Sequence, residues 1–334
     1  MDYRSLGRTG VQVSPLCLGC MNFGWGAEED DSIRMIHRAM DAGINFLDTA
    51  DVYAKGVSEA ITGKALATDG RRDRIVLATK FFNKMDEEDP NAWGGHRYHI
   101  LRACEASLKR LGTDRIDLYQ MHRPHPSVPI DETLRALDDL IRAGKVRYIG
   151  TSTFASWQLV ESLWVAKELG LNRFVCEQPP YNLLDRRIER ELLPMCRTYG
   201  FGVIPWAPLA GGLLSGKYRK GEPRPAGSRY EKEGSAPFGR DNEAAFERAE
   251  SVVALADEKG CTASQFALAW VTAQPGVTSP IIGPRTLEQL EDNLKSMEVR
   301  LSAEELAKVD AVAPPGSHVS EYYQANFGPN ERWT

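Results

Sequence analysis

The sequence lacks any apolar run long enough to cross a membrane. A membrane-spanning helix needs about 20 consecutive apolar residues, and every apolar run in this chain is interrupted well before that length. Residues 1–5 also lack the apolar core that a signal peptide would have. We therefore expect a cytoplasmic protein that has no membrane partner.

An excess of positive charge and a disulfide framework are also missing. The chain has 41 Lys and Arg against 46 Asp and Glu, a net charge of -5, which argues against nucleic acid as the main partner. Six cysteines in 334 residues are too few for a disulfide framework. Cys17 and Cys20 have C-x-x-C spacing, but no second pair follows and residues three apart on a strand face opposite sides. We expect no metal site.

The sequence also lacks a glycine fingerprint of the G-x-G-x-x-G type after its first apolar run. Gly19, Gly24 and Gly26 have the wrong spacing for it. This argues against a doubly wound nucleotide-binding sheet, which the order of elements would otherwise allow as the alternative. No Pro-, Gly- or Ser-rich linker divides the chain, so we expect one domain over residues 1–334.

What the chain does contain is a regular alternation of apolar runs and helical patterns. We expect eight strands at 16–20, 44–48, 74–79, 116–121, 145–151, 173–178, 201–205 and 277–282. We expect helices at 31–40, 57–68, 97–111, 131–143, 156–169, 187–199, 242–259, 262–273, 286–295 and 303–312, with Ser58 as the N-cap of the second. Continuous apolar strands are typical of a parallel sheet that is covered on both faces.

The predicted fold is therefore an α/β (β/α)8 TIM barrel. A hairpin over residues 3–13 would cover the bottom of its core. Residues 207–240 are rich in Gly, Pro and charge and would form a long loop at the carboxyl end of the strands, next to extra helices.

Four polar residues stand at or just beyond the ends of neighbouring predicted strands. Asp48 and Tyr53 follow the second strand, Lys80 the third and His122 the fourth. Because the strands of a barrel all end at one face, we expect these side chains to meet there. Asp48 would orient Lys80, and the Lys80 ammonium would lower the pKa of Tyr53. His122 would position a carbonyl oxygen, although spacing alone leaves the reaction open.

The motifs around these residues resemble those of the aldo-keto reductases, over nearly the whole chain. Residues 43–53 (GINFLDTADVY), 78–80 (ATK) and 117–124 (DLYQMHRP) resemble the signatures of that family. The resemblance implies a hydride-transfer enzyme that reduces an aldehyde or ketone. In such an enzyme Tyr53 is the general acid, Lys80 and Asp48 tune it, and His122 positions the carbonyl.

The resemblance also implies that NADP(H) binds without a nucleotide-binding fold of its own. Residues 150–154 (GTSTF) resemble the loop that holds the nicotinamide amide, although many members have Asn where Thr153 stands. Residues 206–218 resemble the pyrophosphate loop, and Arg285, near the start of the last barrel helix, would meet a 2′-phosphate. The cofactor contacts implied are Cys20, Met21, Asp48, Ser152, Thr153, Gln178, Trp206, Ala207, Pro208, Leu209, Gly211, Leu213, Lys217, Arg229, Gly283, Arg285, Gln289, Asp292 and Asn293.

Two functions remain open at this point. The first is an NADPH-dependent reductase that acts on a small-molecule carbonyl substrate. The second is a regulatory subunit with little turnover, because the β-subunits of voltage-gated potassium channels share this barrel, although they generally lack the histidine that stands here as His122. An unrelated barrel hydrolase or isomerase would not explain the cofactor-like loops. The sequence does not determine the oligomeric state, so a homo-oligomer stays open.

The substrate pocket is expected to be largely apolar and aromatic. Its predicted parts are residues 21–25, the 81–95 loop with Phe82 and Trp93, and a C-terminal group of Tyr322, Tyr323, Phe327 and Trp333.

Overall fold

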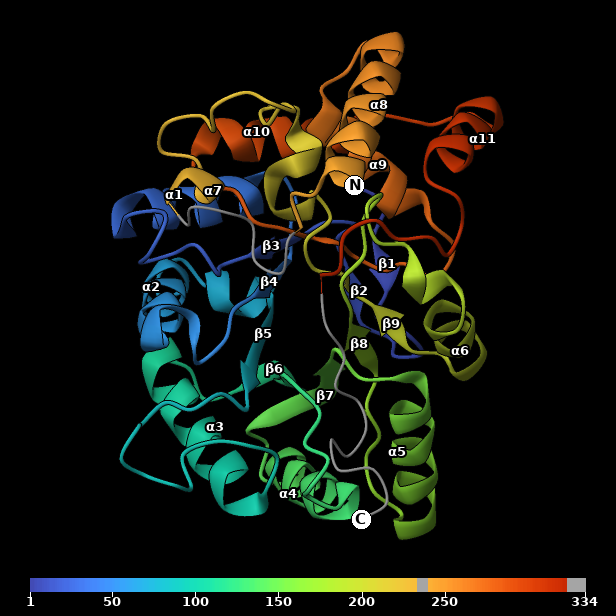
Figure 1. Cartoon of the computed structure of the whole chain (residues 1–334). Coiled ribbons are helices and arrows are strands. Elements are labelled where there is room, and N and C mark those ends of the chain that lie inside the picture. Colours follow the sequence, from blue (N-terminus) through green and yellow to red (C-terminus); the bar gives the residue numbers. More distant parts are fainter. Residues whose placement is uncertain (233–239, 323–334) are drawn as a thin grey trace.

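The computed structural model describes residues 1–232 and 240–322 of the chain. Within them, eight parallel strands surround a central axis and helices surround the strands (Figure 1). The predicted (β/α)8 barrel is therefore confirmed. No helix in this part of the chain combines the length and the apolar character that a membrane crossing requires.

The strands pair in chain order, so each lies beside the one that precedes it in the sequence. They are β3 (Cys17–Gly19), β4 (Phe46–Asp48), β5 (Val76–Phe81), β6 (Ile116–Met121), β7 (Val146–Ser152), β8 (Cys176–Gln178), β9 (Gly202–Val203) and β10 (Ile281–Ile282). The longest ladders join β5 to β6 and β6 to β7. Strand β10 pairs with β3.

The barrel closes between β9 and β10 through a short seam. It contains one bridge, between Val203 and Val277. The N–H of Thr278 donates to the Val203 carbonyl (2.8 Å), and the N–H of Ile281 donates to the Pro205 carbonyl (2.8 Å). The hydroxyl of Thr278 accepts a hydrogen bond from the N–H of Val203 (3.2 Å). A side chain thus takes the place of one ladder carbonyl in this β9–β10 seam.

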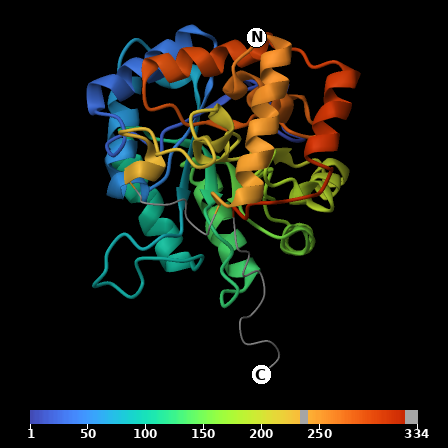
Figure 2. The same cartoon turned by 45° about the horizontal axis from the view of Figure 1, so that its top comes forward.

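The helices cover the outside of the barrel and thicken one side of it, where α8, α9 and α10 cluster (Figure 2). They are α1 (Glu29–Asp41), α2 (Val57–Leu66), α3 (Arg97–Leu111), α4 (Ile130–Arg142), α5 (Ser156–Leu169), α6 (Leu192–Tyr199), α7 (Arg229–Lys232), α8 (Glu243–Lys259), α9 (Ala263–Ala273), α10 (Leu287–Lys295) and α11 (Ala303–Val312). The side chains of Asn242, Thr262, Thr286 and Ser302 cap four of them, each by accepting from a backbone N–H three residues on.

The alternation of side chains along each strand divides the core in two. An inner cluster fills the barrel and contains Phe46, Ala78 and Leu118, whereas an outer cluster packs the strands against the helices. Strands β1 (Arg4–Ser5) and β2 (Gln12–Val13) form the predicted hairpin. Leu6 and Val13 from this hairpin belong to the inner cluster, so the hairpin closes the amino-terminal end of the barrel.

Two local predictions are wrong. The predicted helix at 187–199 begins with a separate 3₁₀ turn at Arg187–Glu189, and α6 starts only at Leu192. Pro194 explains this, because its ring would clash with the carbonyl four residues earlier in a longer helix. Ser58 does not cap α2, whose N-cap is Gly56. The Ser58 hydroxyl is buried and donates to the carbonyl of Cys20 (2.7 Å) instead.

Candidate active site

The carboxyl ends of β4, β5 and β6 bring three of the four predicted polar residues together. Asp48 ends β4, and His122 directly follows β6. Lys80 lies within β5 rather than after it. Tyr53 begins a turn (Tyr53–Gly56) that leads from β4 into α2. All four side chains are largely withdrawn from solvent.

The Lys80 ammonium occupies the centre of this group. It donates to the Asp48 carboxylate, to the carbonyl of Thr49 (2.9 Å) and to the hydroxyl of Tyr53 (3.0 Å). Burial opposes its charge, but the charge of Asp48, the neighbouring Tyr53 and the hydrogen bonds to both together outweigh burial and raise the pKa of Lys80. Lys80 is therefore a permanent cation beside the tyrosine hydroxyl.

Asp48 is held from its other side by two glutamines. Its second carboxylate oxygen accepts from Nε2 of Gln120 (2.9 Å) and from Nε2 of Gln178 (2.9 Å). Sequence reasoning missed Gln120. Strand periodicity could have found it, since Gln120 lies two residues before His122 and pairs with Lys80 in the ladder.

The pKa of Tyr53 moves in the direction opposite to the prediction. Burial raises it above 10, and Asp48 adds to the rise, whereas the nearby Lys80 lowers it only in part. The hydroxyl therefore stays protonated at neutral pH. A protonated hydroxyl 3.0 Å from an ammonium suits a proton donor, because the ammonium stabilises the phenolate that proton loss leaves.

His122 is neutral, and the orientation of the Asn83 amide decides its tautomer. Burial, followed by the charges of Lys80 and Arg123, holds the pKa of His122 well below 6.5. Its Nδ1 lies 2.9 Å from Nδ2 of Asn83. An amide nitrogen can only donate, so Nδ1 accepts and Nε2 carries the proton. The ring meets Tyr53 edge-on, with centroids 5.9 Å apart. Asn83 was not predicted, and no pattern in the sequence marks it.

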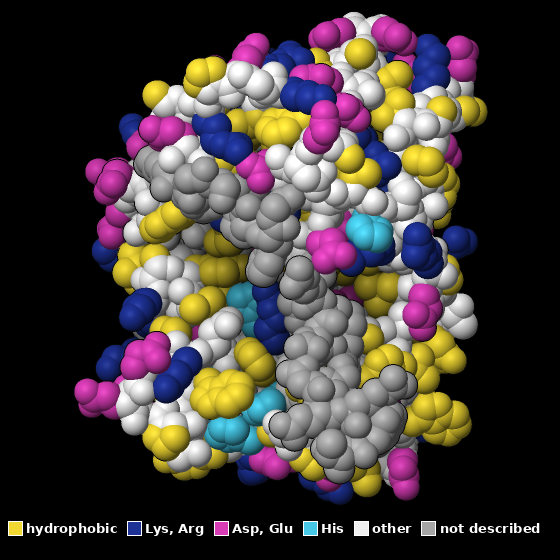
Figure 3. Space-filling view, in the orientation of Figure 1, with side chains coloured by type: hydrophobic (Ala, Val, Ile, Leu, Met, Phe, Trp, Pro, Cys, Tyr) yellow, Lys and Arg dark blue, Asp and Glu magenta, His cyan; other side chains and the backbone are white. Residues whose placement is uncertain are grey.

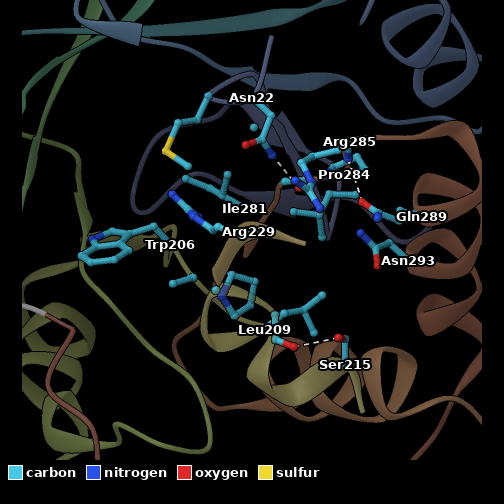
Figure 4. A pocket seen from close by; sticks show the side chains of 18 of the residues that line it. Asn22, Trp206, Leu209, Ser215, Arg229, Ile281, Pro284, Arg285, Gln289 and Asn293 are labelled. Atoms are coloured by element: carbon cyan, nitrogen blue, oxygen red, sulfur yellow. Dashed lines mark hydrogen bonds between the residues drawn. The ribbon is translucent and has the colours of Figure 1, made fainter. Parts of the chain in front are cut away.

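A cavity of about 440 Å³ opens beside Asp48 and Tyr53, a size typical of small-molecule sites. It runs from Trp206 past Arg229 to Arg285 and Asn293 (Figure 4). Fifteen predicted cofactor contacts line it: Met21, Asp48, Gln178, Trp206, Ala207, Pro208, Leu209, Gly211, Lys217, Arg229, Gly283, Arg285, Gln289, Asp292 and Asn293. Asn22 and Ser215 also line it, within the segments 21–25 and 206–218 predicted for the substrate pocket and the pyrophosphate loop, whereas Tyr230, Arg240 and Ser264 line it and were not predicted as contacts.

Four predicted contacts are not among the lining residues. Cys20 and Leu213 are fully buried in the hydrophobic core. The Ser152 hydroxyl donates to the Gln178 carbonyl (2.9 Å), and the Thr153 hydroxyl donates to the Ser152 carbonyl (2.6 Å). Both hydroxyl protons are thus used within the protein, and contact of these residues with a cofactor stays a prediction.

Positive charge gathers along the cavity wall. Lys217, Arg229 and Arg285 all line it. Burial and the charges of Arg285 and Arg229 lower the pKa of Lys217. Three cations that repel one another in a half-buried cavity provide a site for an anionic ligand.

The loop after β9 is shaped around a glycine. Gly211 lies in the left-handed region (φ 65°), and a Cβ there would come within 2.1 Å of the Tyr230 hydroxyl. The short 3₁₀ turn Ala210–Ser215 therefore requires glycine, and it lets the backbone line the cavity directly.

Hydrogen bonds hold the far end of the cavity in shape. The side chain of Gln289 accepts from the N–H of Arg285 (2.9 Å), and the amide of Asn22 donates to the Gly283 carbonyl (2.9 Å). The Asp292 carboxylate accepts from Gln265 (2.7 Å) and Thr262 (3.0 Å). These hydrogen bonds fix the backbone and side chains at this end of the cavity.

Of the aromatic residues predicted for the substrate pocket, Phe82 and Trp93 form a group with His125. The ring of Trp93 lies 4.7 Å from that of His125, and Phe82 meets both edge-on. Figure 3 shows histidine side chains between β5, β6, α3 and α4 on this face. Tyr322 lines the cavity beside Trp206, with ring centroids 6.3 Å apart. Tyr323, Phe327 and Trp333 lie outside the described residues.

In residues 1–232 and 240–322, no three His, Cys, Asp or Glu side chains are grouped so that they could hold an ion. Cys17 and Cys20 are free and buried.

Comparisons with known proteins agree with this geometry. The model of the "Aldo/keto reductase family" matches residues 15–314. The chain is 43% identical to an uncharacterized oxidoreductase, YrpG, of Bacillus subtilis (strain 168), over 97% of this chain and 99% of the relative. It is 37% identical to a probable voltage-gated potassium channel subunit beta of Oryza sativa subsp. japonica, over 97% and 100%.

A third relative carries an activity in its name. Versiconal hemiacetal acetate reductase of Aspergillus parasiticus is 34% identical over 96% of this chain and 100% of the relative. The family match and these full-length similarities lead to one conclusion: the chain belongs to the aldo/keto reductase family, and it is an oxidoreductase.

Proposed function

We propose that this protein is a single-domain enzyme that uses NADPH to reduce an aldehyde or ketone to an alcohol, with Tyr53 as the general acid. One observation carries the proposal. The Lys80 ammonium lies between Asp48 and the Tyr53 hydroxyl at the wall of the cavity. No structural need of a barrel explains a buried ion pair that touches a tyrosine hydroxyl at the carboxyl ends of the strands.

The cavity fits a phosphorylated dinucleotide. Lys217, Arg229 and Arg285 supply positive charge for its phosphates. Arg285, which lines the cavity, would pair with a 2′-phosphate and so favour NADPH over NADH. Trp206 offers an aromatic face at the end of the cavity away from Arg285 and Asn293 (Figure 4). When bound, NADPH supplies the hydride that reduces the carbonyl carbon.

The side chains divide the proton chemistry between them. The Nε2–H of His122 donates a hydrogen bond to the carbonyl oxygen and orients it. Tyr53 gives its proton to the same oxygen as negative charge develops there. Lys80 stabilises the Tyr53 phenolate that results, and Asp48 holds the ammonium in place. Gln178 has both Nε2 protons engaged by Asp48 and Gln120, so it can meet a ligand amide only through Oε1.

The test removes only the Tyr53 hydroxyl. We expect Tyr53→Phe to lower kcat by about 100-fold or more, measured as NADPH absorbance decay with a panel of aldehydes that includes 4-nitrobenzaldehyde. NADPH affinity, from fluorescence titration with NADH in parallel, should change little. Tyr148→Phe is the matched control, because Tyr148 packs against the inner core away from the cavity lining. Near-wild-type turnover of Tyr53→Phe would exclude the acid role.

A second candidate is an NADPH-binding regulatory subunit with little turnover. The similarity to proteins named as potassium channel β-subunits supports it. The same titration separates the two functions, since a regulatory subunit would bind NADPH tightly and turn over none of the carbonyls. His122, with its proton on Nε2, supports the enzyme.

A further inference from the structure

A group of buried polar side chains lies behind the turn that carries Tyr53, on the outer side of the barrel wall. It comprises Asp51 from the loop after β4, Glu59 from α2, Thr79 from β5, Arg110 from α3 and Tyr119 from β6, and we call it the buried polar cluster. Thr79 and Tyr119 pair across the ladder and alternate with the inward-facing Lys80 and Gln120. The cluster therefore packs between the strands and the helices, separate from the cavity.

Glu59 has hydrogen-bond donors and an opposite charge within this cluster. It accepts from the Thr79 hydroxyl (2.6 Å) and from Nε of Arg110 (2.6 Å). The guanidinium also neutralises its charge. Glu59 and Arg110 thus form an ion pair, and no hydrogen bond joins Arg110 to Asp51.

Asp51, in contrast, lacks hydrogen-bond donors to its carboxyl group in the described part of the chain. Its side chain is buried, yet neither carboxyl oxygen has a hydrogen-bond partner in residues 1–232 and 240–322. The hydroxyl of Tyr119 is equally buried and equally without a partner in this part of the chain. Buried polar atoms almost always have partners, so two orphans in one cluster point to a role other than stability.

The surroundings of Asp51 favour its uncharged form. Burial, followed by the negative charge of Glu59, raises the pKa of Asp51 to about 8. The adjoining N–H of Val52, and then the charges of Arg110 and Lys80, oppose this rise but do not cancel it. The Tyr119 hydroxyl keeps its proton, since burial and the neighbouring Cys104 thiol raise its pKa well above 10. At neutral pH the carboxyl of Asp51 therefore carries a proton.

The same loop sets the position of Tyr53. The N–H of Asp51 donates to the carbonyl of Lys80 (3.2 Å), which ties the loop to β5. After Tyr53, both Ala54 (φ 47°) and Lys55 (φ 51°) are left-handed without being glycine, a strained conformation that the surroundings must hold. Gly56 then packs on the cluster, because a Cβ there would lie 2.6 Å from Cδ of Arg110.

We propose that Asp51 is a positioning residue for Tyr53: its carboxyl lies without a partner in the buried polar cluster beneath the strained turn, and a negative charge there weakens the hold on the tyrosine. An Asp51 carboxylate would compete with Asp48 and Tyr53 for the charge of Lys80. It would also place a second negative charge beside Glu59 and push the loop outward. This inference rests on the proposed function, in which Tyr53 donates the proton.

The pH dependence of kcat tests it. A single group with a pKa near 8 predicts that wild-type kcat falls about tenfold between pH 7 and pH 9, at saturating NADPH and 4-nitrobenzaldehyde. For Asp51→Asn, which cannot lose a proton, we expect the ratio of kcat at the two pH values to change less than about twofold. A fall in Asp51→Asn that parallels the wild type would overturn the proposal.

Asp138→Asn is the matched control. Asp138 is another buried carboxyl, on α4, but it accepts from the N–H of Asn172 (3.0 Å) and from Arg142 (2.5 Å). Its variant should show the wild-type decline in kcat between pH 7 and pH 9. If Asp138→Asn lost the decline as well, the effect would not be specific to Asp51, and the proposal would fail.

A second measurement needs no turnover and so separates this inference from the proposed function. The tyrosinate absorbance of a protein minus that of the same protein carrying Tyr53→Phe reports the ionisation of Tyr53 alone. Tyr53 should ionise at lower pH in the Asp51→Asn background than in the wild type, because a nearby negative charge is gone. Equal midpoints would overturn the proposal even if no carbonyl were reduced.

A third measurement uses only the wild-type protein, in case Asp51→Asn does not fold. Infrared spectra of protein labelled with [4-13C]aspartate should show a protonated aspartic acid at pH 7 that disappears above pH 8. The label is necessary because Glu177, also buried, has a pKa of about 8 as well. Absence of a protonated aspartic acid at pH 7 would refute the assignment.

Discussion

Replacing Asp51 by Asn should change how the stability of the protein depends on pH. The pKa of Asp51 is about 8 in the folded protein, against an ordinary value of 3.8. The folded state therefore keeps a proton that the unfolded chain loses, and each pH unit in this window costs the wild type about 1.4 kcal/mol of folding free energy. This loss begins near pH 4, grows as the pH rises, and levels off above pH 8. Asp51→Asn escapes it.

The magnitude follows from that window. Between pH 5 and pH 8 the free energy of unfolding of Asp51→Asn should rise by about 3–4 kcal/mol relative to that of the wild type. Because an uncharged amide and an uncharged carboxyl lack partners alike, the change with pH is more informative than the difference at any one pH. Urea unfolding at four pH values across the range measures it.

A difference that stays constant from pH 5 to pH 8 would refute the reasoning, since it would mean that Asp51 titrates normally in the folded protein. Glu177 contributes equally to the pH dependence of the unfolding free energy in the wild type and in Asp51→Asn, so its contribution cancels when the two are compared. Asp138→Asn should show no such rise between pH 5 and pH 8, because the Asp138 carboxyl is already ionised there in both the folded and the unfolded state. Burial acts to raise the pKa of Asp138, but its hydrogen bonds from Asn172 and Arg142 prevail and lower it. Its stabilising contribution is therefore lost as the pH falls.

Three further predictions concern the candidate site. Because His122 is neutral, kcat should stay level from about pH 7 down to about pH 5, a range in which a histidine with an ordinary pKa would become charged. A fall in kcat below about pH 6.5 that disappears in His122→Gln would contradict this. Arg285→Met should weaken NADPH binding roughly 10- to 100-fold by fluorescence titration and leave NADH unaffected, since a charge-assisted contact contributes about 1.5–3 kcal/mol; equal losses for both nucleotides would exclude a 2′-phosphate contact. Gln120→Leu should lower the free energy of unfolding by about 1–3 kcal/mol in urea, because the Asp48 carboxylate loses a donor; an unchanged midpoint would show that Gln178 alone suffices.

The sequence carried enough information to predict the barrel, because the order of apolar runs and helical patterns depends on local spacing. It was less informative about strand length. The predicted strand at 201–205 shortens to β9 (Gly202–Val203), since Pro205 has no N–H to give to a ladder. The break before α6 follows from the same property of Pro194. Both prolines are visible in the sequence, so both differences arose from giving apolar character too much weight.

At the candidate site, the residues proposed to bear the chemistry could be predicted, whereas Asn83, which supports His122, could not. Asp48, Tyr53 and Lys80 lie in long motifs and do meet in space. Asn83, by contrast, acts on His122 through one hydrogen bond between residues 39 positions apart. The direction of the Tyr53 pKa was predicted wrongly because the sequence shows a neighbouring charge but not the degree of burial that outweighs it.

The β9–β10 seam implies that the barrel is not equally rigid all round. Lys80 and His122 of the candidate site lie within or next to β5 and β6, which share long ladders with each other and with β7, so their amide protons should exchange slowly with solvent. The cavity walls at 206–217 and 283–293 extend from the two strands that share a single bridge. Transient separation of β9 from β10 at that seam would open the cavity and leave Lys80 and Tyr53 in place. A nucleotide that contacts both walls would then stabilise the closed form of the seam. Its binding would slow amide hydrogen exchange in β9 and β10 more than anywhere else in the barrel.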